Sequence, residues 1–229
     1  MFNLLDHNFS QDDPQDQAVK ETLAKTAFYL KEDFASVAPK FLEKLMKDAS
    51  INIDVIKENA EIQTTHEGLN AFQFKLRGME NKQRILFNTS DVLSKTAAFH
   101  HILRVVGAMG ASFEPFIPQV LPLLQQHMSF SHARVLRKYA LKTLQYILLA
   151  KQPSGNQALF HQLFDQFSLH ILSTAGKEGG LKDLKLYFKE LFHCMRVVKD
   201  NNDGTLFESA AKFETFGKLM ERCLQNVTE

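Results

Sequence analysis

Apolar residues recur every three or four positions over most of this chain, a spacing typical of helices that bury one face. Pro, Gly and Asn-Asp-Gly segments interrupt the pattern where one helix would end and the next begin. About eight helices are predicted in this way. They begin near Pro14, Pro39, Ser90, Pro118, Ser131, Leu159, Leu184 and Phe207. Most connections between them are short, so successive helices should pack as antiparallel pairs.

One stretch of the pattern occurs twice. The segment that begins at Asp33 is echoed by the segment that begins at Ser112, at a constant separation of 79 positions. The matched pairs are Phe34 and Phe113, Pro39 and Pro118, Leu42 and Leu121, and Leu45 and Leu124. Internal repetition at a fixed period is the sequence signature of stacked repeats. The chain is therefore predicted to be an array of helical hairpins, which favours a binding surface over an enzyme.

The segment from Ile51 to Asn88 lacks helical periodicity. Phe72, Phe74 and Leu76 alternate with polar residues, as in a strand, and Ile85–Phe87 is the candidate for a second strand. Two alternatives stay open for this insertion, a short β-hairpin and an irregular loop. Because an isolated hairpin is only marginally stable in water, a hairpin here is expected to lie against the helices.

Composition excludes several classes of protein. An apolar fraction of 45% with 20 Phe supplies a large core, and a net charge of +1 argues against direct binding of nucleic acid. The two cysteines, Cys194 and Cys223, form no disulfide framework and fit a reducing compartment. No apolar run approaches the length of about 18 residues that a membrane span needs. A soluble cytosolic or nuclear protein is expected.

Two sets of residues resemble a known family. Leu136–Leu144 is similar to the second helix of a HEAT repeat, and Pro118–Leu124 is similar to the first. The stretch from Asp12 to Val55, which contains Leu45-Met46-Lys47-Asp48-Ala49-Ser50-Ile51, resembles the middle of the importin-five branch (karyopherin beta three) of the importin-beta family. The similarity continues more weakly to about Leu149; beyond Ala150 only the rhythm of helical pairs persists.

The resemblance implies an all-α, right-handed HEAT-repeat solenoid of antiparallel helix pairs. It would be one array over residues 1–229, about four repeats long, with an insertion at 51–88, and would form part of a longer receptor. Such receptors carry protein cargo through nuclear pores and move between cytoplasm and nucleus. They also bind Ran GTPase and phenylalanine-glycine nucleoporins.

The chain departs from the family in lacking Trp, which commonly holds basic cargo signals there. A HEAT scaffold that organises a different multiprotein assembly is the alternative.

One predicted helix carries an unbalanced charge. From Ser131 to Lys151 there are five bases and no acid. The residues expected to attract an acidic partner are Arg134, Arg137, Lys138 and Lys142. The alternatives are a solvated helix face and arginines that pack between repeats.

No residue set predicts catalysis, a metal site or a cofactor site. His100 and His101 are adjacent and point about 100° apart on a helix, so they cannot both face one metal ion. Cys194 lies beside an apolar stripe and is expected to be a small buried residue. The Phe160, Phe164 and Phe167 stripe is expected in the core, with a nucleoporin groove as the alternative. An enzyme is therefore not expected.

Overall fold

A computed structural model gives the fold of this protein and describes residues 13–53, 56–59, 70–74, 83–130, 133–151, 157–176 and 181–200, with single positions between 214 and 225. Helices dominate the described residues. They are α1 (Pro14–Leu30), α2 (Ala38–Ala49), α3 (Thr89–Met109), α4 (Ile117–His127), α5 (Arg134–Lys151), α6 (Gln157–Ala175) and α7 (Leu181–Asp200). Two 3₁₀ helices, η2 (Lys31–Ser36) and η3 (Gly110–Phe116), join α1 to α2 and α3 to α4. The predicted helix from Phe207 lies mostly outside the described residues.

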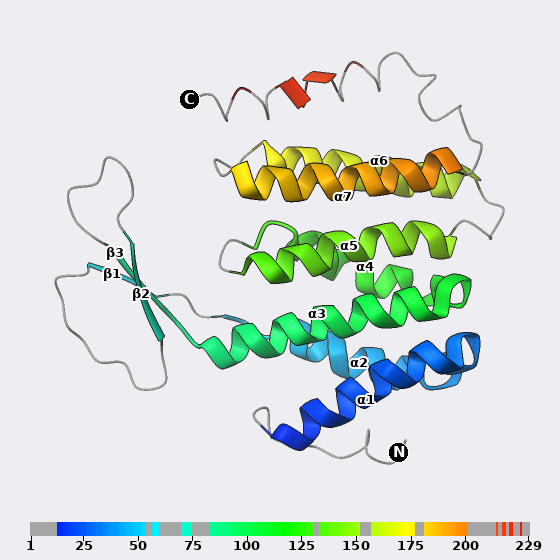
Figure 1. The fold of residues 1–229 in the computed structure, drawn as a ribbon, viewed down its shortest axis with the longest axis horizontal. Coiled ribbons are helices and arrows are strands. Elements are labelled where there is room, and N and C mark those ends of the chain that lie inside the picture. The colour runs from blue at the N-terminus through cyan, green and yellow to red at the C-terminus, as the bar shows by residue number, and fades with distance from the viewer. Residues whose placement is uncertain are drawn as a thin grey trace.

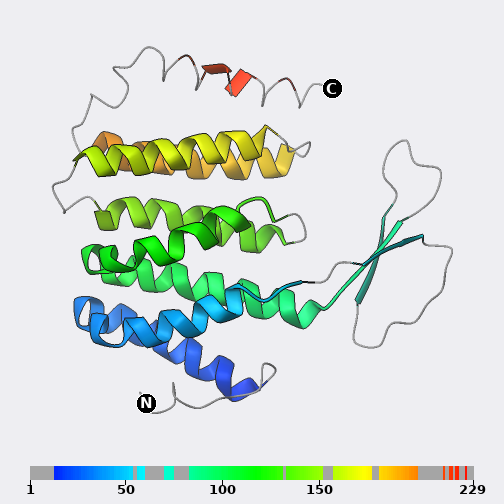
Figure 2. The same cartoon turned by 180° about the vertical axis from the view of Figure 1, so that it is seen from behind.

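The helices form two layers. Figure 1 shows α1, α3, α5 and α7 side by side in a front layer, and Figure 2 shows α2, α4 and α6 in a rear layer. Apolar side chains from both layers fill the space between them as one core. The side chains of Phe160, Phe164 and Phe167 are buried in this core, as predicted. No helix in the described ranges is long and apolar enough to cross a membrane.

The sequence repeat corresponds to a structural repeat. The succession α1, η2, α2 is followed by the equivalent succession α3, η3, α4. Phe34 and Phe113 are both fully buried in the 3₁₀ helices. The residues that end α1 and α3 also match, because Lys31 has a φ of 50° and Gly110 a φ of 54°. The same backbone turn is therefore made once with glycine and once with lysine.

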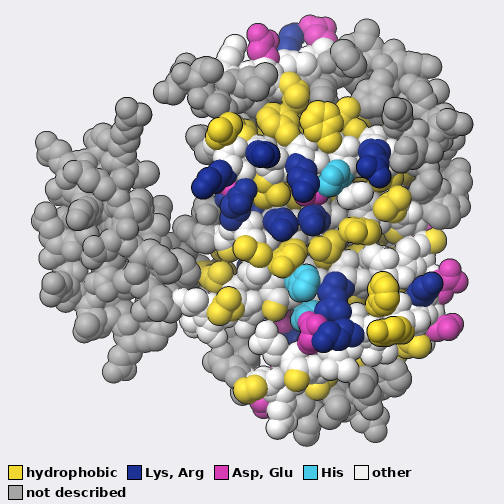
Figure 3. Space-filling model, viewed as in Figure 1, with side chains coloured by type: hydrophobic (Ala, Val, Ile, Leu, Met, Phe, Trp, Pro, Cys, Tyr) yellow, Lys and Arg dark blue, Asp and Glu magenta, His cyan; other side chains and the backbone are white. Residues whose placement is uncertain are grey.

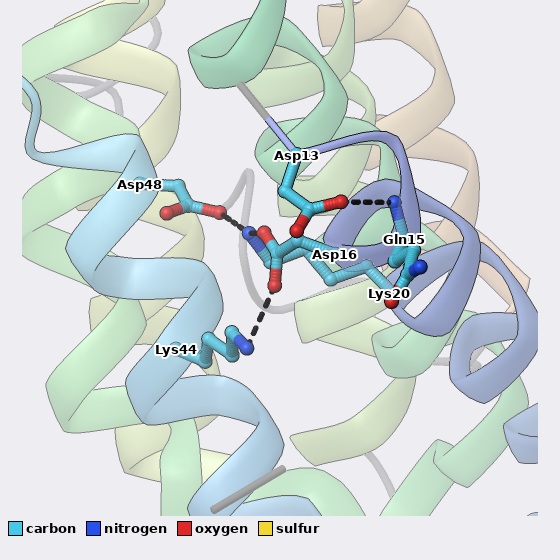
Figure 4. A network of polar contacts seen from close by, with 6 residues as sticks. All are labelled: Asp13, Gln15, Asp16, Lys20, Lys44 and Asp48. Carbon is cyan, nitrogen blue, oxygen red and sulfur yellow. Dashed lines mark hydrogen bonds and ion pairs between the residues drawn. The ribbon is translucent and has the colours of Figure 1, made fainter. Parts of the chain in front are cut away.

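A buried polar network ties α1 to α2. The Lys20 ammonium, on α1, donates hydrogen bonds to Asp16 on the same helix and to Asp48 on α2. Lys44 Nζ, also on α2, lies 2.7 Å from Asp16 Oδ1. Figure 4 shows the four side chains converging between the two helices, next to Asp13, which caps α1 by accepting from the backbone N–H of Gln15 at 2.8 Å. The carboxylates and ammonium groups neutralise one another away from water.

The pKa of Asp16 follows from this network. Burial alone would raise the pKa, but hydrogen bonds and charges from Lys20 and Lys44 outweigh burial and lower it below its ordinary value of 3.8. A lowered pKa means that ionised Asp16 stabilises the fold above about pH 3.8, and that this contribution is lost as the pH falls through the lower folded-state pKa.

The insertion contains a small antiparallel sheet. Its strands are β1 (Ile56–Asn59), β2 (Asn70–Phe74) and β3 (Gln83–Phe87), in the order β1-β3-β2. The β2 and β3 strands pair where the sequence predicts a hairpin or loop, with Phe72 opposite Ile85. The sequence did not predict β1, which pairs along the other edge of β3.

The position of the sheet differs from the expectation. Figures 1 and 2 both show the strands to one side of the helical layers, so the expectation that they lie against the helices was wrong. That expectation considered two strands, whereas the structure pairs three, and a three-stranded sheet depends less on outside support than an isolated hairpin. The start of the insertion is held to the array, since Lys95 Nζ on α3 donates to the Ile51 carbonyl at 2.8 Å.

Replacing Lys20 with Met is expected to lower the free energy of unfolding by about 3–5 kcal/mol, because two largely buried carboxylates lose their shared cation. The control is Lys25→Met on the same helix; the Lys25 side chain is 61% exposed, and its loss should cost less than about 0.5 kcal/mol. Urea unfolding at pH 7 measures both.

Replacing Asp16 with Asn is expected to lower the free energy of unfolding relative to the parent protein, and this difference should shrink below about pH 3.8. Urea unfolding over a range of pH measures it, and a constant difference down to about pH 2.5 would contradict the network.

Substitutions at the two equivalent turns are expected to change the free energy of unfolding in opposite directions. Lys31→Gly should stabilise the protein by about 1 kcal/mol, because glycine adopts a positive φ without strain. Gly110→Ala should destabilise it by about 1–2 kcal/mol. A methyl group at position 110 meets no atom within 4 Å, so backbone strain alone decides the result. Thermal unfolding measures both variants, and a stabilised Gly110→Ala protein would contradict the assigned turn.

Candidate protein-interaction face

The front layer carries a concentration of basic side chains. Figure 3 shows the Lys and Arg side chains gathered across the middle of this face, over α5 and α7. The exposed bases are Arg134 and Lys138 on α5 and Lys182, Lys185, Lys189 and Arg196 on α7, with Lys142 half-buried between them. Three of the four bases predicted from the sequence, Arg134, Lys138 and Lys142, thus belong to a larger basic face, whereas Arg137 is buried beneath it.

The two predicted arginines are engaged within the protein. Arg137 is only 4% exposed, and its Nη2 lies 2.7 Å from Asp183 Oδ1 at the start of α7. Arg134 Nε donates to the same oxygen at 2.9 Å, and its Nη2 donates to the Lys182 carbonyl at 2.8 Å. We call Arg134, Arg137 and Asp183 the arginine clamp. It holds α5 against α7, which is the packing alternative that the sequence left open.

The predicted lysines have a different environment from the arginines. Lys138 is exposed and Lys142 half-buried, and among the described residues no carboxylate pairs with either. The bases on α7 were not among the candidates from the sequence, where Asp183 and Glu190 lie among them. In the structure Asp183 belongs to the arginine clamp and Glu190 is 1% exposed, with Oε2 3.1 Å from His193 Nδ1. Neither acid neutralises the exposed lysines, and the four-residue spacing of Lys185 and Lys189 was the available signal.

Exposed apolar side chains border the basic face. Phe192 on α7 is 59% exposed, and Val135 on α5 is 52% exposed. The Tyr146 ring lies near Gly107 of α3, where it would contact an added Cβ at 3.4 Å. The absence of a side chain at Gly107 therefore lets α3 and α5 approach closely. The front layer as a whole combines exposed cations with exposed apolar groups, a composition suited to protein contacts.

The described histidines and the described cysteine form no reactive arrangement. Burial, more than any other effect, lowers the pKa of His101 to about 4, so this imidazole is neutral at physiological pH. Burial first, and then the charge of Glu190, raise the pKa of Cys194 to about 12, so its thiol is a poor nucleophile. Within the residues that the structure describes, no three His, Cys, Asp or Glu side chains gather as a metal site requires.

A groove of about 620 Å³ lies outside the basic face. Residues of η3 and of the start of α4 form one wall, α6 forms another, and the end of α5 closes it. Ser112, Pro115, Pro118, Lys151, Leu163 and Gln166 are among its lining residues. An ion pair between Lys151 and Glu114 fixes one side of the groove. Proline and leucine side chains make part of its wall apolar.

The arginine clamp generates a direct test of which bases are structural. Arg137→Ala is expected to lower the free energy of unfolding by about 2–3 kcal/mol, since a buried charge-assisted contact and a bond to the Phe130 carbonyl are both lost. Lys138→Ala, one residue away and exposed, should change it by less than about 0.5 kcal/mol. Chemical denaturation measures both, and equal effects of the two substitutions would show that the clamp does not join the helices.

Comparison with known proteins identifies the fold. No family model matches the chain, and no curated protein matches it in sequence. Solved structures of the karyopherin Kap121p do match. Kap121p alone aligns with a TM-score of 0.76 and 15% identity, over 95% of this chain and 20% of that chain. Kap121p bound to Pho4p aligns with a TM-score of 0.74 and 14% identity, over 92% of this chain and 20% of that chain.

A third structure, Kap121p bound to Ste12p, gives a TM-score of 0.72 and 14% identity, over 90% of this chain and 19% of that one. The chain thus spans about a fifth of the length of the solved structures that it matches. The all-α HEAT-repeat solenoid predicted from the sequence is confirmed, and the chain has the fold of a segment of a karyopherin.

Proposed function

We propose that this chain is a protein-binding segment of an importin-beta-like nuclear transport receptor, built as one array of about four HEAT repeats with an insertion at 51–88. The observation that carries the proposal is the alignment with Kap121p over at least 90% of the chain. Solved structures show Kap121p bound to Ste12p, to Pho4p and to the extreme C-terminus of the protein phosphatase Cdc14p. A shared solenoid supports a shared mode of action, in which the stacked helices present an extended surface to other proteins.

The proposal includes the partners and location that a transport receptor has. Protein cargo would bind the front layer, and Ran GTPase and nucleoporins would be further partners in the cytoplasm and nucleus. The groove between α4 and α6 is suited to a phenylalanine side chain, because its volume of about 620 Å³ exceeds that of one aromatic ring and Pro115 and Leu163 offer apolar contacts. The chain would act by binding, not by catalysis.

One observation favours the alternative, a HEAT scaffold outside transport. The front layer is basic over α5 and α7 and the chain has no Trp, so it lacks the side chains suited to hold a basic cargo signal. An assembly factor whose partner is acidic would need no such side chains. The two functions differ in their response to Ran and to phenylalanine-glycine repeats.

Capture on immobilised protein separates these functions. We expect the chain to retain a phenylalanine-glycine repeat peptide, and we expect Leu163→Asp to weaken that retention about tenfold by placing a carboxylate in the groove. GTP-loaded Ran, but not GDP-loaded Ran, should displace captured cell proteins. Leu169→Asp serves as the control, because Leu169 is 47% exposed on α6 and does not line the groove. Failure of both the peptide and the Ran response would favour the non-transport scaffold.

A further inference from the structure

The basic side chains of the front layer are arranged in register. The α5 and α7 helices are neighbours in the layer and run in the same direction (Figure 1). The arginine clamp aligns their first turns, since Arg137 on α5 contacts Asp183 on α7. Both helices rise about 1.5 Å per residue, so the alignment persists along them. Lys138 is therefore about level with Lys185, just beyond the contact between Arg137 and Asp183, and Lys142 is about level with Lys189, one turn further.

We call these four residues the lysine ladder. Within each helix the two lysines are four positions apart and lie on one face. Among the described residues no carboxylate forms an ion pair with any of the four. The closest acids in sequence are accounted for, because Asp183 binds the clamp arginines and Glu190 is buried. The positive charge of the lysine ladder is thus uncompensated, and its members repel one another.

An apolar side chain extends the lysine ladder. Phe192 follows Lys189 by three positions on α7, so the two side chains lie on the same side of the helix. With 59% of its surface exposed, Phe192 is available for contact. The α5 position level with it is Gln145, which is uncharged and partly buried. The ladder therefore ends at a ring with no charge beside it on α5.

We propose that the lysine ladder and Phe192 together bind an acidic protein segment that carries an aromatic or aliphatic side chain. Carboxylates of the segment would lie between α5 and α7 and relieve the repulsion of the lysines, while its apolar side chain packs on Phe192. A protein is favoured over a nucleic acid because the sequence pI is only about 7.8 and the protein as a whole carries a charge of +1. The inference rests on the proposed role as a protein-binding scaffold and adds the chemical class of the partner.

Fluorescence anisotropy with the full 229-residue chain tests the proposal. The probe is a labelled peptide of twelve residues, all Asp or Glu except one central Phe. We expect saturable binding that weakens as salt is raised. Lys142→Glu combined with Lys189→Glu should weaken binding at least tenfold, and Phe192→Ala should weaken it about threefold. The Phe192→Ala effect should vanish with a peptide in which Ser replaces the Phe.

The matched control is Lys31→Glu combined with Lys47→Glu, which makes the same change in net charge at exposed positions on η2 and α2. Its affinity for the peptide should be unchanged. An equal loss in the control would show that net charge alone causes binding and would overturn the proposed site. Tighter binding of a twelve-nucleotide oligo-dT than of the peptide would assign the face to nucleic acid and would also overturn it. Circular dichroism of each variant verifies that it is folded.

The outcome is separable from the proposed function. If the acidic peptide does not bind but GTP-loaded Ran still displaces captured proteins, only this inference fails. If the peptide binds with the expected response to both double variants and Ran has no effect, the acidic-partner surface stands and the transport role fails.

Discussion

Every helix from α1 to α7 depends on its neighbours, because a helical hairpin of this length can bury its apolar face only against the next hairpin. The apolar core runs without interruption from α1 to α7, but apolar contacts alone do not fix how far one helix slides along another. Specific polar contacts add that information in the front layer. Arg104 on α3 donates to Glu21 on α1 at 2.8 Å, and the arginine clamp joins α5 to α7. Similar contacts join the layers, since the Tyr187 hydroxyl donates to the Met128 carbonyl at 2.6 Å.

Much of this fold follows from local signals in the sequence. The segments around Phe34 and Phe113 are similar because each forms the 3₁₀ helix between two α-helices and buries its Phe side chain. The constant separation of 79 positions therefore marks a real structural unit. Proline near the first turn of α2 and α4 marks helix starts, as expected from its fixed φ. The insertion was recognised from its alternation. The β1 strand was missed because Ile56–Asn59 is only four residues long and mostly polar, so its pairing with β3 leaves no clear pattern.

The candidate site was less predictable than the fold, for a physical reason. A count of charges along one helix treats every base alike, whereas the contacts that distinguish Arg137 from Lys138 come from a helix more than forty residues away. Because adjacent helix positions differ in direction by about 100°, Arg137 is directed to α7 and Lys138 to solvent. Glu190 likewise lies among charged residues in the sequence, although its side chain is buried. Charge composition located the face, and only the packing of α5 on α7 could separate its structural bases from its available ones.

The arginine clamp has a consequence for any partner of the front layer. By fixing α5 to α7 it removes the main freedom by which the spacing of the lysines on the two helices could change. The protein side of the interface is then already organised, so almost all of the conformational entropy lost on binding is lost by the partner. Selectivity would depend on the separation between carboxylates in the partner more than on their number. A rigid helix that presents its acids at that separation would therefore bind more tightly than a flexible segment of equal charge.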